Sequence, residues 1–235
     1  MRPAKNSPSL NSSALASAVS AQQIEAARYA IIRRLAPALR HHMVRYLQPI
    51  SLIYGVMDHK LASPGPDLHT LRTHADKMNA LAKAALAQCI DIGTWLAPTP
   101  GVVMGVGEGV MECASLLATT LHFRGFQLVN EVGDMPVRGA QSVFRMVLSA
   151  VLLQVTDALT QPATLTLRAT ADAAVVTLQL QISPNPDDDH VERYDDGYRK
   201  LLWSDVQALA AAEGVRLSRQ EKRVTISIPI EPAAI

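Results

Sequence analysis

The stretch LRHHMVRYLQPI, residues 39–50, lies in the middle of a long predicted helix and contains His41 and His42 side by side, followed by Pro49. A proline inside a helix costs about 3 kcal/mol or more, because it removes a hydrogen bond and clashes with the preceding turn. Two interpretations of this stretch are open. Either it holds two solvated histidines and a tolerated kink, or one histidine is a chemically active group.

Apolar residues continue the helical period on both sides of this stretch. At about 100° per residue, the residues that fall within roughly 40° of Leu39 are Ile32, Leu35, Met43, Tyr46, Ile50, Ile53, Met57 and Leu61. So narrow a stripe over about eight turns is typical of the seam of a helical bundle or coiled coil. On the same helix, His41 lies about 200° from Leu39 and His42 about 60° from it. We therefore expect His41 to project into solvent and His42 to pack beside the seam.

A second helix is predicted after the turn SPGPD, residues 63–67. It covers residues 68–97, and its apolar side is marked by Leu71, Met78, Leu81, Ala85 and Ile92. Two long helices joined by a short turn form an antiparallel hairpin, which cannot cover both of its own apolar faces. We expect residues 22–97 to form a four-helix bundle with a second copy, as a homodimer. The alternative is that the hairpin packs on the rest of the same chain.

The rest of the chain divides into a tail, a linker and a second domain. Residues 1–21 are rich in Ser, Ala, Asn and Pro and are expected to form a mobile tail. The Pro- and Gly-rich residues 98–109 form a predicted linker. Residues 110–235 then show the order helix, strand, helix, two strands, helix, two strands, with a strand pair at ATLTLRATA and AAVVTLQLQIS. This order predicts an α+β fold, a sandwich with helices on one face of a mixed sheet.

The composition restricts the classes of function. Of 235 residues, 49% are apolar, and the formal net charge is +1, so the chain has no excess charge to attract nucleic acid or an anionic membrane. It contains no run of about 20 uncharged apolar residues, and the N-terminus lacks the apolar segment of a signal peptide. Cys89 and Cys113 have no metal-like spacing and are expected to be reduced and buried. We expect a cytoplasmic protein without a bound metal.

The succession of a helical hairpin and an α+β sandwich resembles sensor histidine kinases, over about residues 25–230. These kinases carry a helical segment of the form H-[DE]-x-N-N-x-L-Q-P-I, whose histidine accepts the phosphoryl group. HHMVRYLQPI is similar at His41 and at Leu47–Ile50, and the resemblance implies that His41 is the phosphoryl acceptor. The segment departs from the family at His42, where an acidic residue helps to deprotonate the histidine, and at Val44 and Arg45, where amides are usual.

Two further segments resemble the ATP-binding domain of the same family. FRMVLSAVLLQVTDAL, residues 144–159, is similar to the helix that supplies an asparagine to magnesium and the nucleotide. Ala150 and Gln154 stand where the family has asparagine, whereas Asp157 is kept. DVQALAAAEGVRLSRQEKRVTISIPI, residues 205–230, looks like the closing helix and strand pair.

The nucleotide site that this resemblance implies is incomplete. Ser183 and Pro184 stand where the family has an Asp-x-Gly-x-Gly motif, and the second glycine loop is reduced to one glycine. Phosphates are held by backbone N–H groups in conformations that glycine allows, and Pro184 and Pro186 lack that donor. Gln154 is one methylene longer than asparagine and would displace the carbonyl ligand. We therefore expect no ATP site and no cofactor, and we interpret Asp187–Asp189 as a polar loop rather than a metal cluster.

Three functions fit these observations. The preferred one is a histidine phosphotransferase, in which His41 takes a phosphoryl group from the aspartate of one receiver domain and passes it to another. This role needs only an exposed imidazole and a docking surface, because the receiver supplies magnesium and the acidic groups. The second is a catalytically inactive pseudo-histidine-kinase that binds and regulates a response regulator or a kinase. The third, an active kinase with an unusual nucleotide site, is the weakest, because three parts of that site are missing together.

Three neighbours of His41 are assigned supporting roles. His42 is interpreted as structural or as a weak hydrogen-bonding neighbour. Arg45, one turn after His41, is either an ordinary solvated residue or a cation that holds a phosphoryl group on His41. Pro49 would bend the helix about two turns below His41 and so shape a docking surface.

Overall fold

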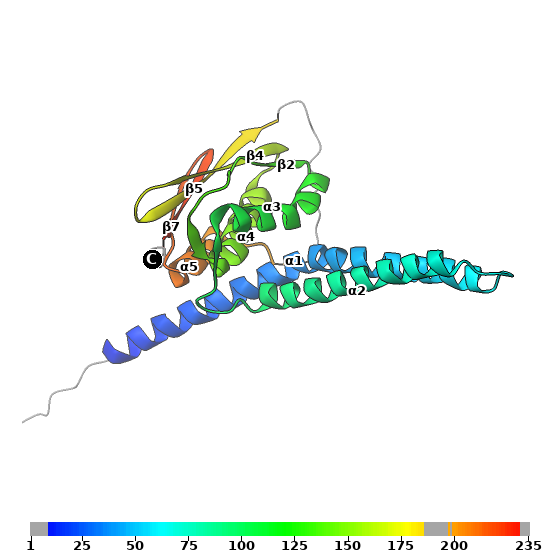
Figure 1. The fold of residues 1–235 in the computed structure, drawn as a ribbon. Coiled ribbons are helices and arrows are strands. Elements are labelled where there is room, and N and C mark those ends of the chain that lie inside the picture. The colour runs from blue at the N-terminus through cyan, green and yellow to red at the C-terminus, as the bar shows by residue number, and fades with distance from the viewer. Residues whose placement is uncertain (1–8, 186–196, 198, 231–235) are drawn as a thin grey trace, which may run out of the picture. The chain divides into compact units, whose positions relative to one another are not determined.

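Figure 1 presents the computed structural model of the chain, in which residues 9–185, 197 and 199–230 are described. The chain forms two compact units. One unit combines Met1–Arg34 with Pro100–Ile235, and the other is Leu35–Thr99. The long first helix therefore contributes its first part to the sandwich unit and its second part to the hairpin unit.

The hairpin is formed by α1 (Ser9–Leu61) and α2 (Leu68–Leu96), as the two helical patterns predict. The turn between them contains Gly65 at a φ of 71°, a conformation that glycine adopts without a Cβ clash. Asp67 caps α2, because its carboxylate accepts hydrogen bonds from the backbone N–H of His69 and from the hydroxyl of Thr70. The turn chemistry of the sequence is thus sufficient to explain where α1 stops and α2 starts.

The seam of the hairpin unit follows the predicted stripe. The buried residues are Leu35, Leu39, Leu71, Ala85 and Trp95, and the half-buried ones include Met43, Tyr46, Ile50, Ile53, Met57, Met78, Leu81 and Ile92. Leu61 departs from the pattern and is 55% exposed. It is the last residue of α1, where the chain leaves the seam to enter the turn.

The first helix starts earlier than the sequence predicts. It begins at Ser9 rather than near residue 22, so residues 9–21 are helical where a tail was expected. No proline or glycine occurs between Ser9 and Ala36, and alanine, the strongest helix former, is frequent there. The helix also packs inside its unit: Ala27, Ala30 and Ile31 are 5% exposed or less. This burial favours a helix that the polar composition of the tail does not predict.

The sandwich unit contains a five-stranded sheet in the order β2-β4-β5-β7-β6. The β2 and β4 strands pair in parallel, and the other neighbours are antiparallel. The strands are β2 (Phe126–Asn130), β4 (Ala163–Ala171), β5 (Val175–Pro184), β6 (Arg216–Gln220) and β7 (Arg223–Pro229). Buried and more exposed residues alternate along β4, β5 and β7, so one face of the sheet forms the core and the other is open and polar.

Helices cover the buried face of this sheet (Figure 1). They are α3 (Val106–Phe123), the π-helical segment η1 (Val143–Leu148) with α4 (Ser149–Ala158), and α5 (Trp203–Ala212). The packing of α3 on η1 is close, because a Cβ added at Gly109 would lie 2.5 Å from ring atoms of Phe144. These layers confirm the predicted α+β sandwich with helices on one face of a mixed sheet.

Three local features of this unit were not predicted. The expected linker, residues 98–109, contains β1 (Val103–Gly105), which pairs with β3 (Arg138–Ala140), and α3 already begins at Val106. The helix expected over residues 140–159 is π-helical over Val143–Leu148, a form that is rare and often marks a local distortion. The α5 helix begins at Trp203, whereas the sequence YRKLLWSDVQALAAAEG predicts a helix from residue 198. The loop with Asp187–Asp189 lies outside the described residues.

Candidate functional site

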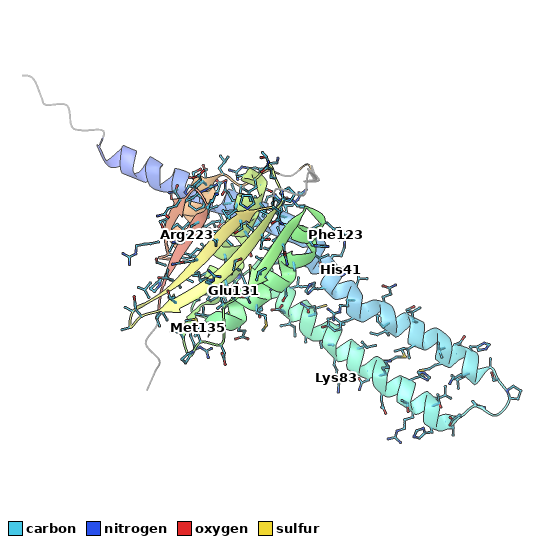
Figure 2. The ribbon with its side chains drawn as sticks, turned by 90° about the horizontal axis from the view of Figure 1, so that it is seen from above. His41, Lys83, Phe123, Glu131, Met135 and Arg223 are labelled. Carbon is cyan, nitrogen blue, oxygen red and sulfur yellow. The ribbon has the colours of Figure 1, made fainter. Side chains whose placement is uncertain are left out.

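The hairpin unit carries the two histidines that the sequence singles out. His41 is exposed on α1 (Figure 2), whereas His42 is half-buried. Their rings meet edge to face, with centroids 6.5 Å apart and an interplanar angle of 68°. Both exposures agree with the helical phases calculated from Leu39. Of the two, His41 offers its ring to a partner in solution.

The surroundings of His42 disfavour its protonation. Partial burial lowers the pKa of His42 from its usual value of 6.5, and the positive charges of His41 and Arg45 lower it further. Asp91, on α2, acts in the opposite direction. Burial has this effect because it removes the water that would stabilise the imidazolium. His42 therefore stays neutral to a lower pH than a free histidine and does not add charge to the site near pH 7.

The part of α1 around His41 is basic. Five arginines and no aspartate or glutamate occur between residues 26 and 57. Arg28 pairs with Glu25 and Glu213, and Arg34 with Asp157, all within the sandwich unit. In the part of the chain that the structure describes, Arg40 and Arg45 have no carboxylate partner, and both are exposed.

Arg45 has one weak contact. Its guanidinium carbon lies 6.0 Å from the ring centroid of Tyr46, which is the outer limit of a cation–π interaction and contributes about 0.5–1 kcal/mol at an exposed site. Arg45 also lies near enough to His42 to lower the pKa of that imidazole. The positive charge of Arg45 is therefore available beside the histidine pair.

The α1 helix continues through the proline that follows the histidines. Pro37 and Pro49 both lie inside α1, which is one helix from Ser9 to Leu61. In an α-helix the carbonyl of Arg45 would accept a hydrogen bond from the backbone N–H of residue 49. Pro49 has no N–H, so this hydrogen bond is not made. Next to it, Gln48 is exposed and Leu47 is 48% exposed. The LQP segment is thus a surface feature of the hairpin, and its backbone differs locally from a regular helix.

One side of the hairpin carries a group of exposed apolar side chains. Leu47 and Tyr54 of α1 are 48% and 61% exposed, and Leu86 and Ile90 of α2 are 63% and 65% exposed. At about 100° per residue in two antiparallel helices, all four project to the same side of the seam. We call these four residues the apolar flank. Exposed apolar side chains grouped in this way are typical of an interaction surface.

The other side of α1 carries His41. Arg45, Leu52 and Val56 fall within about 60° of His41 on the helix. Leu52 is 66% and Val56 46% exposed. His41 therefore shares its side of the helix with an arginine and with exposed apolar side chains, and we call His41, Arg45, Leu52 and Val56 the histidine flank.

The residues at the predicted nucleotide positions lie in the sandwich unit. Ala150 is fully buried and Gln154 is 7% exposed. The Oε1 atom of Gln154 accepts a hydrogen bond of 3.0 Å from Nη1 of Arg219 on β6, and the Arg219 guanidinium carbon lies 5.2 Å from the Trp203 ring centroid. Ser183 lies in β5 opposite Thr164 of β4. The Gln154 amide oxygen is thus engaged by an arginine that the sequence did not connect with it.

Asp157, the residue kept from the family motif, has a structural partner. Its carboxylate accepts two hydrogen bonds from Arg34, of 2.7 and 2.9 Å, and one of 2.9 Å from Arg124. The three side chains are 6–13% exposed. Sequence reasoning missed this cluster, because Arg34 and Asp157 are 123 residues apart and no local pattern joins them.

A cavity of about 360 Å³ lies elsewhere in the sandwich unit, between α3 and β2. It is lined by Ala118, Thr119, His122, Phe123, Phe126, Gln127 and Leu128, so none of the predicted site residues contributes to it. Within the described residues, no cluster of His, Cys, Asp or Glu could hold a metal ion. In that same part of the chain, every helix is too short or too polar to span a membrane.

No family model matches the sequence, and no curated protein matches it. The chain is similar to the solved structure of the histidine kinase AdeS from Acinetobacter baumannii, with 12% identity, 81% of this chain and 98% of that chain covered, and a TM-score of 0.42. It is similar to a histidine kinase from Burkholderia phymatum, with 15% identity, 84% and 97% covered, and a TM-score of 0.41. It is also similar to a bacterial phosphotransferase, with 12% identity, 84% and 95% covered, and a TM-score of 0.35. Histidine kinases, the family that the sequence resembles, are thus found among the solved structures similar to this chain.

Proposed function

We propose that the chain is a cytoplasmic phosphorelay protein that passes a phosphoryl group between receiver domains through His41. In the first step, the lone pair of a neutral His41 ring nitrogen attacks the phosphorus of an aspartyl phosphate. A P–N bond forms while the P–O bond to the aspartate breaks, and the aspartate leaves as a carboxylate. The proton on the other ring nitrogen is free to leave to solvent. The reverse steps deliver the phosphoryl group to the next aspartate.

The exposure of His41 beside uncompensated positive charge is the observation that carries this proposal. A receiver site combines aspartates with a phosphoryl group, so its docking surface is acidic. Arg40 and Arg45 flank His41 without carboxylate partners among the described residues. Complementary charge increases the rate of encounter with such a partner and rejects basic ones.

We also propose that Leu52 and Val56 form part of the receiver's docking surface. They lie on the histidine flank and are 66% and 46% exposed. Apolar side chains next to a charged reacting group give a partner area to bury while it aligns its aspartate.

The apolar flank supports a homodimer. Leu47, Tyr54, Leu86 and Ile90 would be covered if a second hairpin packs against that side and completes a four-helix bundle. The histidine flank is on the other side of α1, so this arrangement leaves His41 accessible. Dimerisation and phosphotransfer would then use different surfaces of the same helix.

The contact between Arg219 and Gln154 supports the absence of ATP-dependent activity. The amide oxygen of Gln154, at an expected magnesium-ligand position, already accepts a hydrogen bond from a cation. Calorimetry with ATP and magnesium should therefore detect no binding. A micromolar dissociation constant would contradict this part of the proposal and favour an active kinase.

Phosphate transfer from a phosphorylated receiver domain tests the proposed function. Wild type should take up acid-labile label, the His41→Ala variant should take up none, and the His42→Ala variant should still be labelled. If wild type takes no label from any receiver encoded in the genome, the alternative of a pseudo-histidine-kinase that binds and regulates a response regulator is favoured.

Light scattering tests the homodimer. Wild type should have twice the monomer mass of 25.4 kDa, and the double variant Leu86→Glu, Ile90→Glu should be monomeric. Leu52→Glu is a matched control, because Leu52 is equally exposed but lies on the histidine flank. It should stay dimeric and lose phosphotransfer. A monomeric wild type would contradict the proposed bundle.

A further inference from the structure

We infer that Arg45 is the positioning residue that binds the phosphoryl group once His41 carries it. This inference rests on the proposed function, since it assigns a role within the same site. Arg45 follows His41 by four residues on α1, so the two side chains are neighbours on one side of the helix. The rise over four residues is about 6 Å, a distance that an arginine side chain spans.

The direction of helical side chains favours Arg45 over the other exposed arginine. Side chains in an α-helix lean toward the N-terminus of the helix, over the preceding turn. Arg45, which is C-terminal to His41, therefore leans toward His41. Arg40 precedes His41 by one residue, about 100° around the helix, and leans away from it. Both arginines are exposed on the same unit, so they differ mainly in the direction of their side chains relative to His41.

Arg45 is free to change its contact. Its guanidinium lies 6.0 Å from the Tyr46 ring centroid, a weak contact, and no carboxylate among the described residues binds it. A phosphoryl group adds about two negative charges and three acceptor oxygens. A guanidinium binds such a group through two parallel, charge-assisted hydrogen bonds. The negative charge of phosphohistidine would therefore draw Arg45 away from Tyr46.

Two other titratable groups near the histidines do not serve this role. His42 has a lowered pKa and is neutral near pH 7, and Asp91 is negative and would repel a phosphoryl group. Arg45 is thus the cation of the histidine flank that can reach His41. The guanidinium stabilises phosphohistidine, because its hydrogen bonds to the negatively charged phosphoryl oxygens are lost when the phosphoryl group leaves. Arg45 therefore slows the transfer of the phosphoryl group from His41 to water.

Chemical phosphorylation separates this inference from the proposed function, because it needs no receiver. Phosphoramidate transfers its phosphoryl group to an imidazole nitrogen as its own P–N bond breaks and ammonia leaves. The full chain would be labelled in this way in wild type, Arg45→Gln, Arg45→Lys and Arg40→Gln forms. Mass spectrometry would locate the label, and 31P NMR would follow its loss after the donor is removed.

The expected result is label on His41 in wild type and loss about three- to tenfold faster in Arg45→Gln, the size expected for one ordinary hydrogen bond at an exposed site. Arg45→Lys should restore part of the lifetime, and Arg40→Gln should match wild type. Equal lifetimes in Arg45→Gln and Arg40→Gln, or no label on His41, would overturn the inference. Transfer from a receiver to His41 would still test the proposed function independently, and its failure would leave the chemically measured lifetimes unchanged.

Discussion

The sandwich unit and the hairpin unit use the same kinds of residue in opposite ways. In the sandwich unit, Arg34 and Arg124 share the carboxylate of Asp157, and the side chains are 6–13% exposed. In the hairpin unit, Arg40 and Arg45 are exposed, and no carboxylate of the described residues binds them. A buried charge needs a partner, whereas water stabilises an exposed one. One helix, α1, thus supplies an arginine that is buried in an ion pair in one unit, and arginines that water stabilises in the other.

The same contrast extends to cysteine and glycine. Cys113, in α3, is buried, whereas Cys89, in α2, is exposed, although the sequence predicted that both would be buried. Gly109 in α3 has no space for a Cβ, whereas a Cβ at Gly93 in α2 would meet no atom within 4 Å. The sandwich unit is thus closely packed around Cys113 and Gly109, whereas the hairpin unit leaves Cys89 and Gly93 exposed to solvent.

Thiol reactivity should show the largest difference between the units. Burial raises the pKa of Cys113 to about 12, so at pH 8 only about one molecule in ten thousand carries the reactive thiolate. A disulfide reagent at that pH should modify Cys89 in the folded chain and both cysteines in urea. Equal rates for both thiols in the folded chain would contradict the close packing of the sandwich unit around Cys113.

The substitution Asp157→Asn should destabilise the chain by about 3–5 kcal/mol, because it removes the carboxylate that the buried guanidinium groups of Arg34 and Arg124 share. Urea unfolding would measure the loss. Asp58→Asn is the matched control in the hairpin unit, where Asp58 is exposed, and it should change the free energy of unfolding by no more than about 0.5 kcal/mol. Similar unfolding midpoints for the two variants would contradict a stabilising role of the Asp157 ion pairs.

The substitution Gly109→Ala should cost about 1–3 kcal/mol, because its Cβ would overlap the ring of Phe144 in the tight contact between α3 and η1. Gly93→Ala, on the open side of α2, should instead stabilise the helix by up to about 1 kcal/mol. Thermal unfolding would then shift in opposite directions for the two variants. A stabilised Gly109→Ala variant would show that α3 and η1 are packed less closely.

His42 should produce the smallest effect, a pH dependence of stability. Its folded pKa lies below the 6.5 of the unfolded chain, so between these two values the unfolded chain binds more protons. Stability should therefore decline as the pH falls from about 6.5 through the folded pKa of His42. Urea midpoints between pH 5 and 8 would show a smaller decline in His42→Gln than in wild type. A steeper decline in the variant would contradict the assigned sign.

The sequence predicted elements that depend on residues close together in the chain. The stripe through Leu35 and Leu39, the Pro-Gly turn before α2 and the alternation in β4 all arise from local periodicity or turn chemistry. The same reasoning placed His41 in solvent and His42 beside the seam. It failed for residues 9–21, because packing of the following turns favours a helix where the composition is that of a tail.

By itself, then, the sequence determined the hairpin, the order along the chain of the main helices and of the strands in the five-stranded sheet, and the candidate His41 with Arg45 beside it. Only the tertiary structure decided which arginines are paired and which cysteine is exposed. It also decided that Asp157 anchors Arg34 and Arg124, and that Gln154 binds Arg219. The physical reason is the separation along the chain of the residues that interact. Helical phase and turns depend on neighbours along the chain, whereas an ion pair across 123 residues exists only when the fold brings its partners together.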